Sequence, residues 1–173
     1  MTLNLEQRVQ PIELLLSDVD GVMTDGGVAF DNQGIEIKQF HIRDGLGIQL
    51  WRRAGYRFGM ITGRSSHIVR MRGVELGIEI VRQGVDDKLA VVRQIAAESG
   101  LDLRQVGFMG DDLPDLAVMR QVGLAIAVAD ADEAVRGVAH MTTRAPGGRG
   151  AVREAIEWIL KAQGRWDDLV QKY

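Results

Sequence analysis

Short apolar runs alternate with segments of helical period along almost the whole chain, and this alternation leaves few folds open. The runs end at small or acidic residues: Ile12 to Ser17 stops at Asp18, Tyr56 to Ile61 at Thr62, Val106 to Met109 at Gly110, and Leu124 to Val128 before Asp130. Such runs are typical of buried strands, and their alternation with helices indicates a mainly parallel sheet. We therefore expect an α/β domain of Rossmann-like, doubly wound type.

Candidate helices lie between the apolar runs, beginning at capping residues and ending at glycines. They are expected over Leu46 to Ala54, Ser66 to Leu76, Lys88 to Glu98, Leu113 to Gln121, Asp132 to Val138 and Ala151 to Gln163, with a short further strand at Glu79 to Val81. Asp86 or Asp87 is the expected N-cap of the helix that starts at Lys88.

One segment, residues 27–40, breaks this rhythm. Gly27 to Phe40 has the pattern of two short strands around the turn-rich sequence Asp31 to Gly34. An isolated hairpin is marginally stable in water. We therefore expect a projecting hairpin that pairs with another copy of the chain.

Composition bounds the class of protein. The 173 residues are 46% hydrophobic, which suits a single compact domain over residues 1–173, with 164–173 as a C-terminal tail. The net charge of −3 argues against nucleic acid or an anionic membrane as a partner. There is no cysteine and no apolar run near the roughly 20 residues of a membrane span, so we expect a cytoplasmic protein.

Polar residues follow the strands at the positions where chemistry is expected. Asp18 and Asp20 come directly after the first run, and Thr62 and Asp111 follow two later ones. Ligands of open α/β sheets bind outside the carboxyl ends of the strands. The acid pair alone fits a capping turn equally well, whereas an EF-hand loop is excluded because Val22 and Met23 stand where an acid and a glycine are needed.

The order of the polar motifs carries a family resemblance. After the aspartate pair come Thr62-Gly63-Arg64, then Lys88 at a helix start, then the acidic cluster Gly110 to Asp115. In this the chain resembles the haloacid dehalogenase-like superfamily, whose four motifs are an aspartate pair, a threonine or serine, a lysine and a late acidic cluster. The resemblance implies a magnesium-dependent phosphatase.

The roles implied by this resemblance suit a very slow reaction. Hydrolysis of phosphate monoesters requires accelerations up to ~10²¹-fold. Asp18 is the implied nucleophile, forming an aspartyl phosphate, and Asp20 the implied general acid and base. Thr62 and Lys88 would hold the phosphoryl group, and Mg²⁺ would be bound by Asp18, the main-chain carbonyl of Asp20, and Asp111. Asp112 and Asp115 are expected to have secondary roles, as support for the metal site or, for Asp112, as a helix cap.

Motif spacing narrows the resemblance. Asp18 and Thr62 are 44 positions apart and Thr62 and Lys88 are 26 apart, so neither gap accommodates a cap domain. The stretches Lys38 to Gly47, Ile61 to Ser66 and Pro146 to Glu154 resemble the capless, tetrameric 3-deoxy-D-manno-octulosonate (KDO) 8-phosphate phosphatases, over Leu14 to Leu160. That family makes a sugar for lipopolysaccharide.

This closer resemblance implies a set of substrate contacts, partly across a subunit boundary. They are Asp20, His41, Ile42, Arg43, Asp44, Gly45, Gln49, Thr62, Gly63, Arg64, Arg72 and Lys88. Arginine forks suit a substrate that carries both carboxylate and phosphate. Gln49 stands where some members have arginine, and His41 where asparagine is frequent, which leaves the sugar acid open.

Three alternatives stay open from the residues. One is another enzyme, a phosphatase for a nine-carbon sugar acid phosphate or a mutase-like phosphotransferase. The second is a phosphorylation-receiving signalling domain, which fits poorly because Thr62 stands where its phosphorylated aspartate belongs. The third is a tetrameric scaffold with an inactive site. Steady release of phosphate separates an enzyme from the other two.

Overall fold

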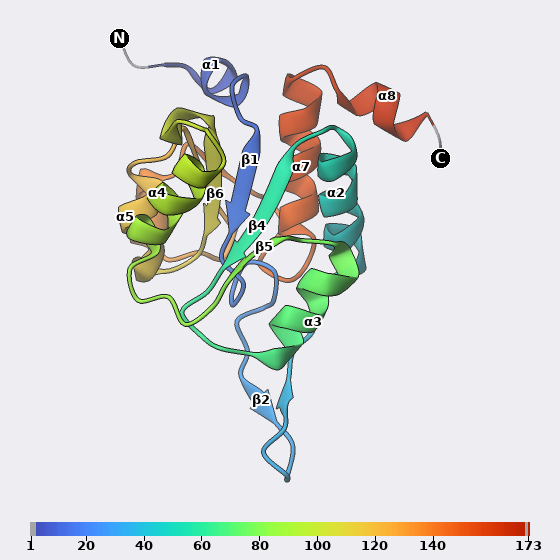
Figure 1. Cartoon of the computed structure of the whole chain (residues 1–173), viewed down its shortest axis with the longest axis vertical. Helices are drawn as coiled ribbons and strands as arrows, with labels where there is room; N and C mark the ends of the chain where they lie inside the picture. The colour runs from blue at the N-terminus through green and yellow to red at the C-terminus, as the bar shows by residue number, and fades with distance from the viewer. Residues whose placement is uncertain (1–2, 172) are drawn as a thin grey trace.

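A six-stranded parallel sheet forms the centre of the chain. The computed structural model describes residues 3–171 and 173. The strands are β1 (Leu14–Ser17), β4 (Arg57–Ile61), β5 (Ile80–Arg82), β6 (Val106–Gly110), β7 (Leu124–Ala127) and β8 (Met141–Thr142), in the order β5-β4-β1-β6-β7-β8. Every neighbouring pair is parallel, which confirms the expected doubly wound α/β fold (Figure 1).

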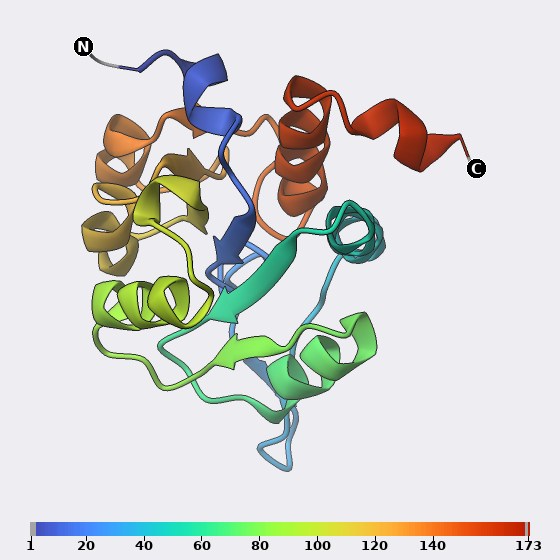
Figure 2. The ribbon, with the colours of Figure 1, turned by 45° about the horizontal axis from the view of Figure 1, so that its top comes forward.

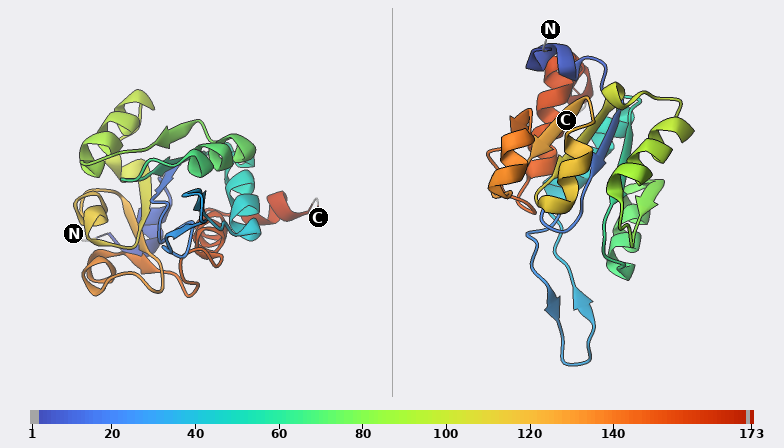
Figure 3. Two further views of the ribbon diagram at one scale, coloured as in Figure 1. Left: turned by 90° about the horizontal axis from the view of Figure 1, so that it is seen from below. Right: turned by 90° about the vertical axis from the view of Figure 1, so that its left-hand side faces the viewer.

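Helices cover both faces of this sheet. On one face lie α2 (Ile42–Arg53), α3 (His67–Leu76) and α7 (Ala151–Ala162), with α2 packed against α7. On the other lie α4 (Lys88–Glu98), α5 (Leu116–Met119) and α6 (Glu133–Val138), as the end-on view of Figure 3 shows. The chain crosses from one face to the other between β5 and β6, beside β1. Ligand sites of such sheets form at this reversal.

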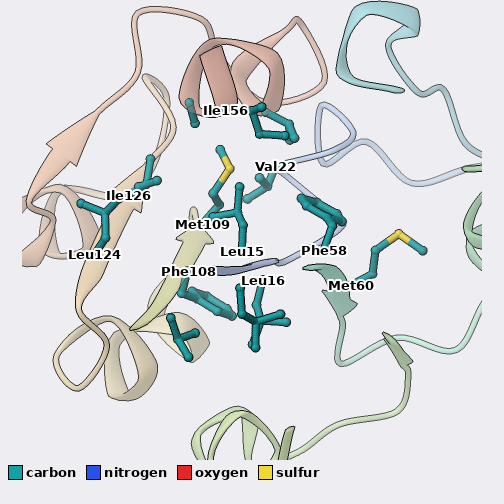
Figure 4. Packing of buried hydrophobic residues seen from close by; sticks show 14 of the residues in the cluster. Leu15, Leu16, Val22, Phe58, Met60, Phe108, Met109, Leu124, Ile126 and Ile156 are labelled. Carbon is teal, nitrogen blue, oxygen red and sulfur yellow. The ribbon is translucent and has the colours of Figure 1, made fainter. Parts of the chain in front are cut away.

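The core fills both faces of the central strands. Leu15 and Met109 point toward α7, where Ile156 lies, whereas Leu16 and Phe108 point to the opposite face (Figure 4). All five side chains are fully buried. Because both faces are covered, β1 is apolar at successive positions rather than alternating, as expected of a central parallel strand.

A hairpin projects from the carboxyl end of the sheet. Strands β2 (Ala29–Phe30) and β3 (Glu36–Ile37) pair antiparallel, and their turn is closed by Asp31, whose Oδ1 accepts the N–H groups of Gln33 and Ile35. Figure 3 shows the hairpin extending well beyond the domain. Its apolar side chains Val28, Phe30, Ile35 and Ile37 are all more than half exposed. The projecting hairpin is confirmed, and residues 3–171 and 173 contain no separate cap domain.

Two expected helices differ in the structure. α2 begins at Ile42 rather than Leu46, because Gly45 and Gly47 serve close packing and do not stop the helix. A Cβ at Gly47 would lie 3.1 Å from Arg153 Cα. The helix expected over Leu113 to Gln121 is instead a 3₁₀ turn, Leu113–Asp115, followed by the short α5. The short α1 (Leu5–Val9), the 3₁₀ turn Leu103–Gln105, β8 and α8 (Trp166–Val170) had no clear signal.

The C-terminal tail folds back on its own chain. Arg165 donates to the carbonyl of Ala54 at 3.1 Å, and the Arg153 guanidinium lies 5.2 Å from the Trp166 ring centroid. Figure 2 shows α8 at the end of the molecule opposite the hairpin. Over the described part of the chain, none of the helices combines the length and apolarity needed to cross a membrane.

Candidate active site

The polar motifs meet in one pocket at the carboxyl edge of the sheet. Asp18, Thr62 and Asp111 directly follow β1, β4 and β6, which are adjacent strands. The pocket has a volume of about 440 Å³ and is lined by Asp18, Asp20, Thr62, Gly63, Arg64, Val85, Asp86, Lys88, Asp111, Asp112, Pro114 and Asp115. The structure thus brings together Asp18, Asp20, Thr62, Lys88 and Asp111, the residues whose roles the four motifs imply.

Lys88 is a buried cation in this pocket. It is the first residue of α4, whose N-cap is Asp87: the Asp87 side chain accepts the N–H of Ala90 at 3.0 Å. Lys88 Nζ lies 3.0 Å from Asp18 Oδ1 and 2.6 Å from Asp115 Oδ1. Burial by itself would lower the pKa of Lys88, but the two carboxylates outweigh it and the pKa is raised. Lys88 is therefore a fixed positive charge beside Asp18.

Three carboxylates crowd the floor of the pocket. Oxygen atoms of Asp18, Asp111 and Asp115 lie within 4.8 Å of one another. Burial raises the pKa of Asp18 to about 6, although Lys88 opposes it. Burial, and then the charges of Asp18 and Asp115, raise the pKa of Asp111 to about 8. A divalent cation would relieve this repulsion.

The hydrogen bonds show which of these carboxylates are free to bind a metal. Asp115 is committed, since Oδ1 bonds Lys88 and Oδ2 accepts the N–H groups of Asp111 and Asp112 at 3.0 and 3.3 Å. Asp111 Oδ1 is buried and has no hydrogen-bond partner among the described residues. Hard oxygen ligands of this kind suit Mg²⁺. Asp18 and Asp111 are thus the side chains that could hold the ion, with Asp115 as their support.

Asp20 lies at the side of the pocket. Its Oδ2 accepts the Thr62 hydroxyl at 3.2 Å, and its Oδ1 is paired with Lys38 Nζ. The Thr62 hydroxyl in turn accepts the N–H of Arg64 at 3.2 Å. The Asp20 side chain is 19% exposed and therefore open to the pocket. This partial exposure would let a substrate oxygen approach the Asp20 carboxylate, as proton transfer requires.

A glycine-rich loop fixes the segment that carries both aspartates. Gly21 has φ +97°, and a Cβ there would overlap Asp111 Oδ2. Gly148 donates its N–H to Val22 O at 2.9 Å, and a Cβ at Gly147 would overlap Gly21 O. The loop Pro146 to Gly150 thus braces its own chain's aspartate loop, a role that the sequence did not indicate.

Most residues expected to bind the sugar acid lie outside this pocket. Gly63 and Arg64 line it, but His41, Ile42, Arg43, Asp44, Gly45, Gln49 and Arg72 do not. Asp44 is buried and accepts the N–H of Arg153 at 2.7 Å, at the start of α7. Arg43 lines a separate groove beside α7, and Gln49 lines another surface hollow. Their contact with substrate stays a prediction.

Two further side chains reach the site from the hairpin. Lys38 pairs with Asp20, and Glu36 accepts Arg64 Nη2 at 3.1 Å and the Ser66 hydroxyl at 2.6 Å. Sequence reasoning gave neither a role: Glu36 belongs to no motif, and Lys38 is only the first residue of the stretch Lys38 to Gly47 that carries the closer resemblance. The available signal was their spacing of two residues, which puts them on one side of an extended strand.

Comparison with known proteins identifies the family of the chain. Residues 66–156 match a family described as haloacid dehalogenase-like hydrolase. The KDO 8-phosphate phosphatase of Yersinia pestis is 45% identical over 159 residues, covering 92% of this chain and 85% of that protein. The corresponding protein of Escherichia coli K12 is 40% identical over 161 residues, covering 93% and 86%.

Solved structures give the same result. The KDO 8-phosphate phosphatase of Moraxella catarrhalis, crystallised with magnesium, phosphate and KDO, superposes with a TM-score of 0.94 at 41% identity, covering 96% of each chain. A cobalt-bound phosphatase of the same name from Haemophilus influenzae has a TM-score of 0.89 at 37% identity, covering 92% of this chain and 94% of that one. The chain therefore belongs to the haloacid dehalogenase-like hydrolases.

Proposed function

We propose that this chain is a magnesium-dependent phosphatase that hydrolyses KDO 8-phosphate to the free sugar acid and phosphate. The observation that carries the proposal is the position of Lys88 Nζ, 3.0 Å from Asp18 Oδ1 in a pocket that also contains Thr62 and Asp111. A nucleophile, a fixed cation and a hydroxyl donor there can surround one phosphoryl group. The Moraxella catarrhalis relative, which holds KDO and phosphate, supports the substrate.

The first chemical step transfers the phosphoryl group to the protein. A carboxylate oxygen of Asp18 attacks phosphorus, and the bond between phosphorus and the sugar oxygen breaks. The leaving oxygen keeps the electron pair and takes a proton from the Asp20 carboxyl group. Lys88 holds the phosphoryl oxygens as charge develops, and the Thr62 hydroxyl joins it by turning its hydrogen from Asp20 to a phosphoryl oxygen.

The second step regenerates the enzyme. Water attacks phosphorus and gives its proton to the Asp20 carboxylate, so Asp20 returns to the acid form. The bond between phosphorus and Asp18 breaks, the Asp18 carboxylate is restored, and inorganic phosphate leaves. Asp20 thus acts once as acid and once as base, which requires a side chain open to the pocket.

Asp18, Asp111 and the main-chain carbonyl of Asp20 would hold the magnesium ion. Asp111 Oδ1 is buried and has no partner within residues 3–171 and 173, and this and the raised pKa of Asp111 fit such a ligand set. When bound, the ion neutralises charge between the anionic nucleophile and the anionic phosphoryl group.

A second copy of the chain completes the substrate site in this proposal. The exposed apolar hairpin needs a partner, and residues such as His41, Gln49 and Arg72 lie outside their own chain's pocket. A cytoplasmic homotetramer built through the hairpins would place such residues near a neighbour's pocket. Arg64 is 45% exposed and could pair with the substrate carboxylate.

A panel of substrates tests the proposed function. We expect steady phosphate release from KDO 8-phosphate with Mg²⁺, and a kcat/KM at least tenfold lower for nine-carbon sugar acid phosphates and unrelated sugar phosphates. Asp18→Asn should reduce turnover more than about a hundredfold without unfolding the protein. Asp102→Asn, an exposed aspartate far from the pocket, is the matched control. Equal rates across the panel contradict the substrate, and a single turnover indicates a receiver domain.

A further inference from the structure

We infer that Lys38 is a positioning residue that holds Asp20 in place for proton transfer. The inference rests on the proposed function, because it gives Asp20 the acid and base role. Lys38 belongs to none of the four motifs and follows strand β3 of the projecting hairpin. The hairpin therefore supplies the active site of its own chain with a side chain.

The geometry limits what Lys38 can do. Its side chain is 2% exposed, and its Nζ is paired with Asp20 Oδ1 and lies 3.3 Å from Glu36 Oε1. The second oxygen of Asp20 accepts the Thr62 hydroxyl at 3.2 Å. Asp20 is thus held from two sides, by Lys38 from the hairpin and by Thr62 from the end of β4. Two contacts to one carboxylate fix its orientation, which a single contact would not do.

Burial makes this lysine different from a surface ion pair. An exposed pair contributes at most about 1 kcal/mol and need not persist. An ammonium group withdrawn from water must instead keep its partners, because an unpaired buried charge is strongly destabilising. Within the described residues, Asp20 and Glu36 are its two carboxylate partners, and Lys38 must remain against them.

Glu36 anchors the arrangement on its other side. It accepts Arg64 Nη2 at 3.1 Å and the Ser66 hydroxyl at 2.6 Å, and both partners follow β4. The hairpin is therefore bound to the two loops that flank the pocket, one through Lys38 and the other through Glu36. A movement of the hairpin relative to the sheet would displace Asp20.

Two other roles for Lys38 make different kinetic predictions. A lysine that binds the substrate directly would affect KM, or would slow phosphoryl transfer from every ester. A lysine that only fixes the hairpin would affect assembly and stability. A residue that acts through Asp20 affects the steps in which Asp20 moves a proton, and no others.

Leaving groups separate these roles. A sugar alkoxide needs a proton to leave, whereas 4-nitrophenolate is stable as an anion and leaves without one. For Lys38→Met we expect kcat on KDO 8-phosphate to fall about 10- to 100-fold with KM changed less than about threefold. With 4-nitrophenyl phosphate, the first step should stay within about threefold of the parent rate. The second step still needs Asp20 as base, so a burst of one 4-nitrophenol per site should precede slow turnover.

A double-mutant cycle and two controls complete the experiment. When Asp20→Asn is already present, adding Lys38→Met should lower kcat by a further factor of less than about three, because the lysine acts through that carboxylate. Lys38→Arg, which keeps the charge, should recover most of the lost kcat. Lys161→Met removes an exposed lysine paired with Glu157 on α7 and should be silent. Circular dichroism and size-exclusion chromatography on every variant show whether fold and assembly persist.

Several results would overturn the inference. One is a raised KM with unchanged kcat, and another is a first step with 4-nitrophenyl phosphate that is slowed as much as the reaction of KDO 8-phosphate. Additive losses of kcat in the double mutant would also contradict it. So would a loss of assembly in which the remaining assembled protein has normal kinetics. If Lys38→Met fails to fold, Lys38→Arg and the cycle made with Lys38→Gln decide. Failure of the parent enzyme on KDO 8-phosphate would refute the proposed substrate alone, since the 4-nitrophenyl phosphate measurements still test Lys38.

Discussion

Asp115 Oδ1 lies 2.6 Å from Lys88 Nζ, while the other oxygen of the same carboxylate accepts the backbone N–H groups of Asp111 and Asp112. The buried Asp115 side chain therefore positions two groups. One is the Lys88 ammonium beside the nucleophile Asp18, and the other is the loop that carries Asp111, a candidate metal ligand. Neither oxygen of Asp115 is left for substrate. Asp115 acts by holding other groups in place.

Asp115→Asn tests this relationship. An amide has one acceptor oxygen, so its NH₂ group must face either Lys88 or the backbone N–H donors. We expect kcat to fall at least tenfold, and the free energy of unfolding to fall by about 1–3 kcal/mol, the cost of leaving buried polar groups unsatisfied. Urea unfolding and steady-state kinetics measure the two effects. Asp102→Asn, at an exposed turn, should change neither, and parent-like kinetics in Asp115→Asn would refute the role.

The crowded carboxylates predict a pH-dependent response to metal. Burial and neighbouring charges raise the pKa of Asp18 to about 6 and that of Asp111 to about 8, above the ordinary value of 3.8. Between about pH 4 and pH 8 the folded, metal-free protein binds protons that the unfolded chain has released, so this pair lowers stability as pH rises. Mg²⁺ binds the ionised pair, and the increase in Tm on adding Mg²⁺ should be larger at about pH 8 than at about pH 5.

Calorimetry with and without Mg²⁺ at both pH values measures this difference. Asp111→Asn should abolish most of the magnesium-dependent shift, because it removes a ligand and one of the repelling charges. An equal rise in Tm at both pH values would show that the ion binds elsewhere.

Gly21→Ala should inactivate the enzyme through the metal site. Gly21 has φ +97°, where any side chain costs about 1 kcal/mol, and its added Cβ would also overlap the Asp111 carboxylate. Gly55 has a similar φ of +91°, but no atom of the described residues lies within 4 Å of an added Cβ. Gly55→Ala should therefore show the backbone cost alone, whereas Gly21→Ala should in addition lose more than about tenfold in kcat. Equal activity of the two variants would disprove the close approach.

Phe30→Glu should separate the subunits of the proposed assembly. Phe30 is 57% exposed on β2, and a charge there would oppose burial against another hairpin. Sedimentation velocity should show a smaller species whose circular dichroism spectrum is unchanged. Leu3→Glu, at an apolar residue 50% exposed just before α1, which lies at the other end of the molecule in Figure 1, should leave the mass as it was. An unchanged mass for Phe30→Glu would exclude assembly through the hairpin.

The parts of the fold that could be predicted are those with a strong local cause. Lys88 to Glu98 is a helix at the expected residues, because Asp87 caps it and Gly100 follows it. The four motif positions meet because parallel strands share one carboxyl edge. Residues that follow different strands could therefore be predicted to lie close together. The start of α2 was missed because Gly45 and Gly47 are explained by packing against Arg72 and Arg153, which are distant in sequence.

In the site, too, residues with a local sequence signal could be predicted, whereas residues placed by contacts distant in sequence could not. Asp18, Thr62, Lys88 and Asp111 carry signals in their residue type and spacing. Lys38 and Glu36 become neighbours of Asp20 and Ser66 only when the hairpin folds against the sheet, and no local pattern encodes that contact. The sequence likewise did not indicate that Asp115 binds both Lys88 and the backbone N–H groups of Asp111 and Asp112. An aspartate three residues after Asp112 is also a common turn residue.

The hairpin has apolar residues along its strands and, just beyond them, a lysine that pairs with Asp20 of the catalytic pocket. If the hairpins pair as proposed, the turnover per subunit would depend on enzyme concentration, because dilution that frees the hairpin would also loosen Asp20. Peptides that cap the strand edge would then act as inhibitors without contacting the phosphate or metal positions.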